Sequence, residues 1–481
     1  MRIQFPALVF LLACLPGSLS GQEPKPKPGD EFFGTTKVHT LHLSISPDEF
    51  DKLTPKGGAG PFGPPGGPPG FGGPSPSNSA PPQNAPDGSG HRNTFGVEFS
   101  WAQADLEFNG KALSKIGIRY KGNFTYMATA TALKKSFKLD FDRFVDDQTL
   151  DGLSMVNLHC GVSDPTMTRE SMSFQFFRDA GIPAPRTCFA EVTLTVPGRY
   201  ERELVGVYTV TEQVNRTFLE RHFGSGEGML LKPENLMKGP EYLGTKWKDY
   251  ASIYDPEGKP SDEQKQRLIK LAHTITHASD EQFASEIETC LDVDAFLKFI
   301  AANAILSNLD SYLGFGHNYY LYLVPSTNRF VFIPWDLDLS LATWPAVGTP
   351  EQLVELSLRH PHAGENKLLD RILANEGFRN RYNALVRELF EQQFRKDKLL
   401  AILEPIEAAL NLPAEQEKAA VAKRNEKQAG FGFGGMQFGQ SMPPRLFIDK
   451  RTESIKAQLD GTSDGYIPKA FGAFGPPGGP R

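Results

Sequence analysis

The chain has 481 residues, a formal net charge of −6 at pH 7 and 39% apolar residues, which suits two or three domains or one large one. The mildly acidic balance argues against nucleic acid as the main partner, because binding to nucleic acid needs a basic field. Glycine and proline number 46 and 38, without a strict Gly-X-Y period, which excludes collagen. No apolar run after residue 20 reaches the roughly 18 residues that a membrane-spanning helix needs.

The first 20 residues have the three parts of a secretory signal. The pair Met1–Arg2 is a basic start, residues 5–15 are nearly all apolar, and small residues precede a cleavage point near Ser20. This pattern predicts export to the periplasm, the cell surface or the medium. The run that ends at Cys14 faintly resembles a lipoprotein box, so a lipid anchor at Cys14 stays open as an alternative.

Composition separates three flexible segments from the folded body. Residues 21–36 form a polar leader, and 22 of the 36 residues at 55–90 are glycine or proline. Such a segment cannot bury a core, so we expect a disordered insert there. A second glycine-rich patch lies at 430–439, and residues 461–481 are expected to form a flexible Gly/Pro-rich tail.

The folded body divides into a β-rich part, 37–215, and a mostly helical part, 216–460. Apolar and polar residues alternate in the first part, which predicts strands at 38–45, 95–108, 117–120, 137–141, 187–196 and 203–211. The sequence also predicts helices at 46–53, 164–180, 262–277, 280–288, 293–308, 365–374, 376–391, 396–410, 414–427 and 447–459.

The helix expected at 164–180 has Asp164 as its N-cap and Pro165 as its first residue. Its Phe176 and Phe177 are expected to pack against the sheet. A disulfide between Cys160 and Cys188 is an open option if the protein is exported.

A hairpin interrupts the helical part, with strands at 317–324 and 329–333. Because a hairpin returns the chain to its start, Asp310 and Asn318 at its entrance should lie near Asp336 at its exit. Two carboxylates and an amide suit a Mg²⁺ site with few protein ligands. The alternative is that each acid only caps a turn or a helix.

The order of these residues matches phosphoryl transfer by a protein kinase. Lys138 would hold phosphates, Glu170 would orient that lysine, and the strand that leads into Glu212 would be the hinge. Asp310 and Asp336 follow in the kinase order. The usual kinase words G-x-G-x-x-G, H-R-D and D-F-G are absent, as is a P-loop.

Several words in this order resemble the spore coat protein H (CotH) kinase family. They are Arg119–Asn123 with Lys134–Phe141, Asp164-Pro165 with Arg169-Glu170, Gly206–Tyr208 with Glu212, Asn308 with Asp310, His317–Tyr320, and Pro334–Asp338. The resemblance covers about residues 36 to 460. It implies a divergent protein-kinase-like two-lobed α+β fold, with a β-rich N-lobe and a helical C-lobe. It also implies ATP, Mg²⁺ or Mn²⁺, and phosphorylation of Ser or Thr in proteins outside the cytoplasm.

By this resemblance Lys138 is the phosphate-binding lysine, Asp310 the catalytic aspartate and Asp336 the metal-binding aspartate. The role of Glu170 is inferred from its helix position. Asp310 and Asn318 are eight residues apart, more than the five of ordinary kinases, which departs from the pattern.

Four further residues complete the expected site. Lys121, in the turn 119–123, and Glu212 would contact the nucleotide. Asn318 or Asp338 would be a second metal ligand.

The sequence favours plainer roles for several other residues. We expect Lys232 to lie in a solvated turn, His317 to bond a backbone group, and Trp335 and Tyr320 to belong to the core. A non-catalytic, kinase-like surface or coat assembly protein remains the alternative function.

Overall fold

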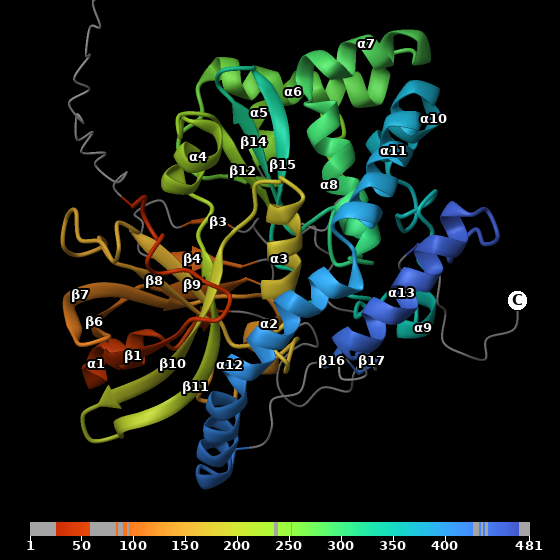
Figure 1. Cartoon of the computed structure of the whole chain (residues 1–481). Coiled ribbons are helices and arrows are strands. Elements are labelled where there is room, and N and C mark those ends of the chain that lie inside the picture. The colour runs from red at the N-terminus through yellow and green to blue at the C-terminus, as the bar shows by residue number, and fades with distance from the viewer. Residues whose placement is uncertain are drawn as a thin grey trace, which may run out of the picture.

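The computed structural model describes residues 26–57, 83–84, 90–93, 96–234, 239–251, 253–426, 432–433, 436–437 and 441–470. The signal segment, most of both glycine-rich inserts and the last eleven residues lie outside these ranges. The α+β fold class is confirmed, with a sheet-rich N-terminal part and a largely helical C-terminal part (Figure 1).

Seven of the described strands close into a barrel in the order β1-β10-β11-β9-β8-β7-β6. β1 closes it by pairing parallel with β10 and antiparallel with β6. The strands are β1 Val38–Ser44, β6 Ala102–Phe108, β7 Lys111–Tyr120, β8 Phe137–Asp140, β9 Met155–His159, β10 Thr187–Val196 and β11 Tyr200–Glu212. Their alternation places one apolar face in the barrel core, as at Ile118, Leu139 and Leu158.

The two ends of the predicted disordered insert 55–90 are ordered. Beside the barrel lies a sheet of order β2-β5-β4-β3, made of β2 Lys56–Gly57, β3 Gln83–Asn84, β4 Gly90–Arg92 and β5 Val97–Ser100. Pairing with β5 satisfies the backbone groups at the two ends of the insert, so the expected boundaries were wrong there. The helix α1, Pro47–Lys52, begins at the N-cap Ser46 as predicted.

The C-terminal part consists of a small sheet and a layer of helices. The sheet has the order β13-β12-β14-β15, with β12 Leu230–Pro233, β13 Tyr254–Pro256, β14 Tyr319–Val324 and β15 Arg329–Pro334. The remaining elements are α2 Phe124–Ala128, α4 Arg216–Phe223, α5 Trp247–Ala251, α6 Asp262–His277, α7 Asp280–Cys290, α8 Val293–Ile305, α9 Pro350–Leu353, α10 Lys367–Ala374, α11 Glu376–Gln392, α12 Lys396–Lys423, α13 Pro444–Leu459, β16 Gly432–Phe433 and β17 Met436–Gln437. None of the described helices is both long and apolar enough to span a bilayer.

The helix α3, Arg169–Asp179, begins four residues later than predicted. Asp164 is not its N-cap; the Asp164 carboxylate accepts from the Arg169 backbone N–H at 2.8 Å and pairs with the Arg169 guanidinium at 2.5 Å. Phe176 and Phe177 belong to the large apolar core of the helical part and not to the barrel core. The expected packing of these two rings on the sheet was therefore wrong, and α3 lies between the two parts (Figure 1).

The two cysteines of the barrel, Cys160 and Cys188, lie too far apart for a disulfide. Cys160, Cys188 and Cys290 are buried free thiols. Cys160 follows β9 and Cys188 lies on β10, with β11 between these strands. Two strand spacings are about 9–10 Å, which exceeds the reach of a disulfide, so the Cys160–Cys188 bridge does not form.

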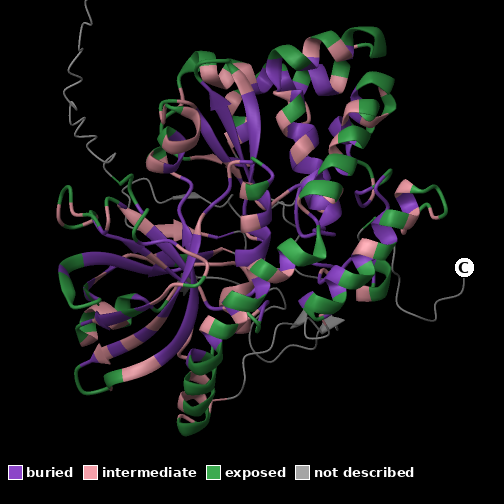
Figure 2. Cartoon of the chain, in the orientation of Figure 1, coloured by how far each residue is buried: buried purple, intermediate pink, exposed green. Residues whose placement is uncertain are grey.

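The two helices expected at 396–410 and 414–427 are one continuous helix, α12, that contains Pro405 and Pro413. Proline inside a helix removes a hydrogen bond and costs about 3 kcal/mol. Packing outweighs this cost, because α12 joins both parts of the molecule. Leu403 lies in the helical core, whereas Leu410 packs on the barrel. Figure 2 shows buried residues concentrated in the strands and on the inner helices, and exposed residues on the outer helices and loops.

Glu417 ties the far end of α12 to the barrel. Its carboxylate accepts from the Lys134 ammonium at 2.7 Å and from the Val207 backbone N–H at 2.7 Å. A Cβ at Gly206 would lie 2.8 Å from the Glu417 carboxyl carbon, so glycine permits this close approach.

Replacing Glu417 with Ala should lower the free energy of unfolding by about 1–3 kcal/mol, because it leaves a partly buried ammonium and a backbone donor without their acceptor. Chemical denaturation measures this loss. Glu415→Ala, at an exposed position of the same helix, is the control and should change stability little. Equal stability of both variants would show that Glu417 does not anchor α12.

Candidate functional site

The outer face of the barrel carries a row of polar residues opposite the helical part. Arg119 on β7 pairs with Lys138 on β8, which pairs with Asn157 on β9. Their neighbours Ile118 and Leu139 point into the barrel core. The alternation that buries the apolar face therefore presents this polar face to the rest of the molecule.

A cavity of about 300 Å³ lies between this face and the C-terminal sheet and hairpin. Six of the eight predicted site residues line it, and these are Lys121, Lys138, Asp310, Asn318, Asp336 and Asp338. Glu170 and Glu212 do not line it. Trp335 and Tyr320 are buried, as predicted, yet they also line the cavity.

The hairpin of β14 and β15 closes as predicted. The Trp335 backbone N–H donates to the Asn318 carbonyl at 3.2 Å, and the Asn318 side-chain amide donates to the Asp310 carbonyl at 2.9 Å. Asn318 and Asp336 both have left-handed backbone conformations, with φ of 57° and 55°. This conformation is uncommon for non-glycine residues, although Asn and Asp adopt it more readily than others, and it occurs often at functional sites.

His317 holds the carboxylate of Asp310. The ring Nε2 lies 2.9 Å from Asp310 Oδ1, and Phe315 stacks against the ring with centroids 5.8 Å apart. The sequence favoured a backbone partner for His317, which was wrong. The hydrogen bond fixes the direction in which the Asp310 carboxylate points.

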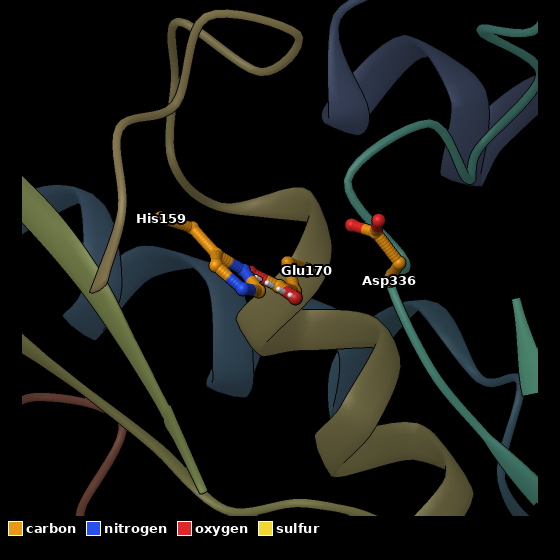
Figure 3. A group of neighbouring side chains, drawn as sticks. All are labelled: His159, Glu170 and Asp336. Atoms are coloured by element: carbon orange, nitrogen blue, oxygen red, sulfur yellow. Dashed lines mark hydrogen bonds and ion pairs between the residues drawn. The ribbon is translucent and has the colours of Figure 1, made fainter. Parts of the chain in front are cut away.

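Glu170 contacts a histidine instead of a lysine. Its carboxylate accepts from His159 Nδ1 at 2.8 Å, and Lys121 Nζ lies 2.8 Å from His159 Nε2. Among the described residues no ion pair joins Glu170 to Lys138, so the predicted pairing was wrong. Because α3 begins at Arg169, Glu170 lies in its first turn beside the end of β9 (Figure 3).

His159, Glu170 and Asp336 come from three different elements and form a candidate metal-binding group. One ligand atom of each lies within 4.8 Å of the others, and Figure 3 shows Asp336 across from the other two side chains. His159 is not among the residues predicted from the sequence, because its strand β9 was not predicted. The alternation of Val156 and Leu158 with polar neighbours is the signal that could have found this strand.

Burial and neighbouring carboxylates raise the pKa of two aspartates of the site. Burial raises the pKa of Asp336, and Glu170 and Asp310 add to the effect. Burial and then the charge of Asp336 raise the pKa of Asp338 well above its usual range. Grouped buried carboxylates ionise fully only with a cation nearby, so this donor set suits a hard divalent ion.

The cations that face these acids are partly buried. Burial lowers the pKa of Lys121 to about 7, although the nearby charge of Asp336 opposes the shift. Burial lowers the pKa of Lys138 to about 8. Lys232 lines the cavity and pairs with Glu234, so the expectation of a solvated turn lysine was wrong.

Glu212 has a structural partner. Its carboxylate accepts from the Arg186 guanidinium at 2.5 Å and from the Arg186 backbone N–H at 3.0 Å. Glu212 is the last residue of β11. The next residue, Gln213, does line the cavity. These contacts do not support the predicted nucleotide contact of Glu212.

Replacing Glu212 with Gln should therefore lower the melting temperature by a few degrees, since a buried ion pair loses one charge. Ligand binding in the cavity should stay within about twofold of the parent chain. Thermal melting and ligand titration measure the two effects. Retained stability with lost ligand binding would restore Glu212 to the site.

Lys138 gives a pH-dependent prediction. Lysine titrates near 10.4 in an unfolded chain, and its pKa here is about 8. Folding therefore bears the full cost of burying this charge below pH 8, and the cost disappears as the pH rises toward about 10.4. Lys138→Met should melt on the order of 1–3 °C higher than the parent at pH 7, and the difference should shrink toward pH 10.

The exposed Lys111→Met on β7 is the matched control, because its side chain lies in water in both states. Differential scanning calorimetry across pH 7–10 measures both variants. A Lys138→Met effect that does not depend on pH would contradict a buried, low-pKa ammonium.

Comparisons with known proteins identify the family. The family model described as CotH kinase protein matches residues 118–441. The inner spore coat protein H of Bacillus subtilis (strain 168) is 30% identical over 313 residues, which cover 63% of this chain and 79% of that protein. The chain therefore belongs to the CotH kinase protein family, as its motifs indicated.

Two solved structures show distant likeness. One is a chain of the Shewanella oneidensis MR-1 toxin–antitoxin complex of HipA, HipB and operator DNA, with a TM-score of 0.28, 12% identity, and coverage of 65% of this chain and 59% of that chain. The other is the Helicobacter pylori proinflammatory kinase CtkA, with a TM-score of 0.23, 8% identity, and coverage of 58% of this chain and 94% of that chain. Likeness this low assigns no residue roles.

Proposed function

We propose that this chain is an exported protein kinase that transfers the γ-phosphoryl group of ATP to Ser or Thr of secreted or surface proteins, with Mg²⁺ or Mn²⁺. The observation that carries the proposal is one cavity lined from the barrel by Lys121 and Lys138 and from the hairpin by Asp310 and Asp336. This brings phosphate-binding cations opposite metal-binding and proton-accepting carboxylates. Membership of the CotH kinase protein family supports the same reaction class.

In this mechanism Asp310 orients the acceptor hydroxyl and takes its proton while the hydroxyl oxygen forms a bond to the γ-phosphorus. The bond from that phosphorus to the β,γ-bridging oxygen breaks, and ADP leaves. His317 keeps the Asp310 carboxylate directed at the acceptor. Lys121 and Lys138 neutralise phosphate charge, so most of the rate gain comes from positioning and electrostatics.

The donor set of the cavity fits a divalent metal. Asp336, with Asp338 or Asn318, would hold it, because these oxygens line the same cavity and the charge of Asp336 adds to the burial that raises the pKa of Asp338. The metal would supply charge neutralisation across the phosphates. Hard oxygen donors of this kind suit Mg²⁺ or Mn²⁺.

A second candidate function is a non-catalytic role in surface or coat assembly. The observation that favours it is the relative at 30% identity, which is an inner spore coat protein. In that case the cavity would bind nucleotide without turnover, or bind none. A coat or surface location agrees with the predicted export signal.

Two substitutions separate these functions. Asp336→Asn should abolish metal-dependent ATP binding. Asp310→Asn should leave ATP affinity within a fewfold and slow phosphoryl transfer by orders of magnitude, because its role lies at the acceptor hydroxyl. Titration calorimetry measures binding, and transfer of labelled phosphate to casein or to the chain itself measures turnover.

Asp146→Asn, at an exposed position outside the cavity, is the matched control and should keep both properties. ATP binding by the parent chain without any phosphate transfer would favour the assembly role. Full activity of both cavity variants would contradict the kinase proposal.

A further inference from the structure

We infer that His159 connects Glu170 to Lys121, so that α3 positions Lys121, and not Lys138, for contact with nucleotide phosphate. The inference rests on the proposed function, since it says which of the two phosphate-binding lysines α3 positions. In the kinase arrangement expected from the sequence, the lysine and the glutamate form a direct ion pair. Here three side chains, those of Glu170, His159 and Lys121, contact one another in series.

The hydrogen bonds of this chain have one consistent direction. The Glu170 carboxylate is an acceptor, so His159 Nδ1–H donates to it across 2.8 Å. This leaves Nε2 of a neutral ring as an acceptor, and the Lys121 ammonium donates to it across 2.8 Å. The position of the glutamate on α3 therefore fixes the position of the lysine through the ring.

Lys121 is held on two further sides. Its ammonium donates to Asn157 Oδ1 at 3.1 Å and lies 5.3 Å from the centre of the Trp335 ring. Asn157 is fixed in turn by the side chain of Gln213, whose oxygen accepts from its amide at 3.0 Å. An ammonium has three N–H groups; two are used here, which leaves one for a ligand in the cavity that Lys121 lines.

The turn after β7 allows the Lys121 side chain to reach His159 and Asn157. Gly122 follows with φ of 106°, and a Cβ there would lie 2.4 Å from Thr125 Oγ1. Only glycine fits this turn without strain. The turn bends the chain away at the end of β7, so the Lys121 side chain stays over the outer face of β9.

Because of the strand register in the barrel, Lys138 lies outside the series of contacts that runs from Glu170 through His159 to Lys121. Lys138 pairs with Arg119 and with Asn157 on its two sides. Lys121 and His159 each lie two residues along from those partners, at the end of the strands nearer to α3. Lys138 has no ion pair among the described residues, and the charges with the largest effect on its pKa are those of Glu257, Arg119 and Lys232.

The glutamate at the other end is well anchored. Glu170 is 2% exposed and lies in the first turn of α3, whose start is fixed by the buried Asp164–Arg169 pair. The rest of α3 packs into the helical core through Phe176 and Phe177. The position of α3 therefore determines where the Glu170 carboxylate lies and, through His159, where the Lys121 ammonium lies in the cavity.

A metal ion on His159 is the competing explanation of the same cluster. Both ring nitrogens are already engaged, one by Glu170 and one by Lys121. A metal at His159 would have to displace one of these partners. The observed contacts therefore favour the lysine-positioning role.

Double-mutant cycles on ATP affinity test the inference. Lys121→Met and Glu170→Gln should each weaken MgATP binding by about 10-fold or more. The double variant should be within about twofold of Lys121→Met alone, because both changes remove one function. In the matched cycle of Lys138→Met with Glu170→Gln, the two losses should multiply. In a His159→Phe background Glu170→Gln should have little further effect.

A second readout does not depend on nucleotide. The rate at which a small acetylating reagent modifies each lysine, followed by mass spectrometry, reports how firmly its ammonium is held. Glu170→Gln and His159→Phe should each raise the rate at Lys121 severalfold and leave Lys138 unchanged. A parent chain that binds no ATP would refute the proposed function, whereas this labelling pattern would still support the positioning of Lys121.

Three results would overturn the inference. One is a cycle in which Glu170 couples to Lys138 and not to Lys121. Another is an unchanged labelling rate at Lys121 in both variants. The third is loss of Mn²⁺ binding by the nucleotide-free His159→Phe chain in titration calorimetry, which would make His159 a metal ligand.

Discussion

Crowding of negative charge in one buried cavity is the constraint that governs this structure. Burial raises the pKa of Asp336 and of Asp338, the charge of Asp336 raises the pKa of Asp338 further, and Glu170 and Asp310 add to both shifts. Such a group is stable only with compensating cations. Lys121 supplies one from the barrel, and a metal with a phosphate ligand would supply the remaining charge balance. The pattern of charges therefore explains both why the outer face of the barrel is polar where it borders the cavity and why the site suits a metal nucleotide.

Two helices, α3 and α12, hold the cations of the barrel opposite the acids of the hairpin. α3 carries Glu170 and packs in the helical core, while α12 runs from that core to the barrel and ends in the contacts of Glu417. The cations come from strands and the acids from the hairpin, so relative movement of the two parts would separate them. The prolines in α12 show that packing across this junction outweighs local helix preference.

Local patterns predicted much of the fold and of the site. The hairpin, its flanking Asp310 and Asp336, and the strand with Lys138 follow from alternation and turn residues. Tertiary contacts decided the rest. Nothing local shows that Glu212 binds Arg186 across the sheet. The strand that ends in His159 does alternate, but its five residues make that alternation a weak signal. The partner of Glu170 depends on where α3 begins, which the buried Asp164 determines through a side-chain contact instead of a cap.

The most direct measurement is a crystal structure of the mature chain with a non-hydrolysable ATP analogue and Mn²⁺, with the metal located by its anomalous signal. The account predicts a metal peak in contact with the Asp336 carboxylate, phosphate oxygens within hydrogen-bond distance of Lys121, and the γ-phosphate facing Asp310. A nucleotide bound outside the cavity, or a cavity that stays empty at saturating analogue and metal, would contradict it.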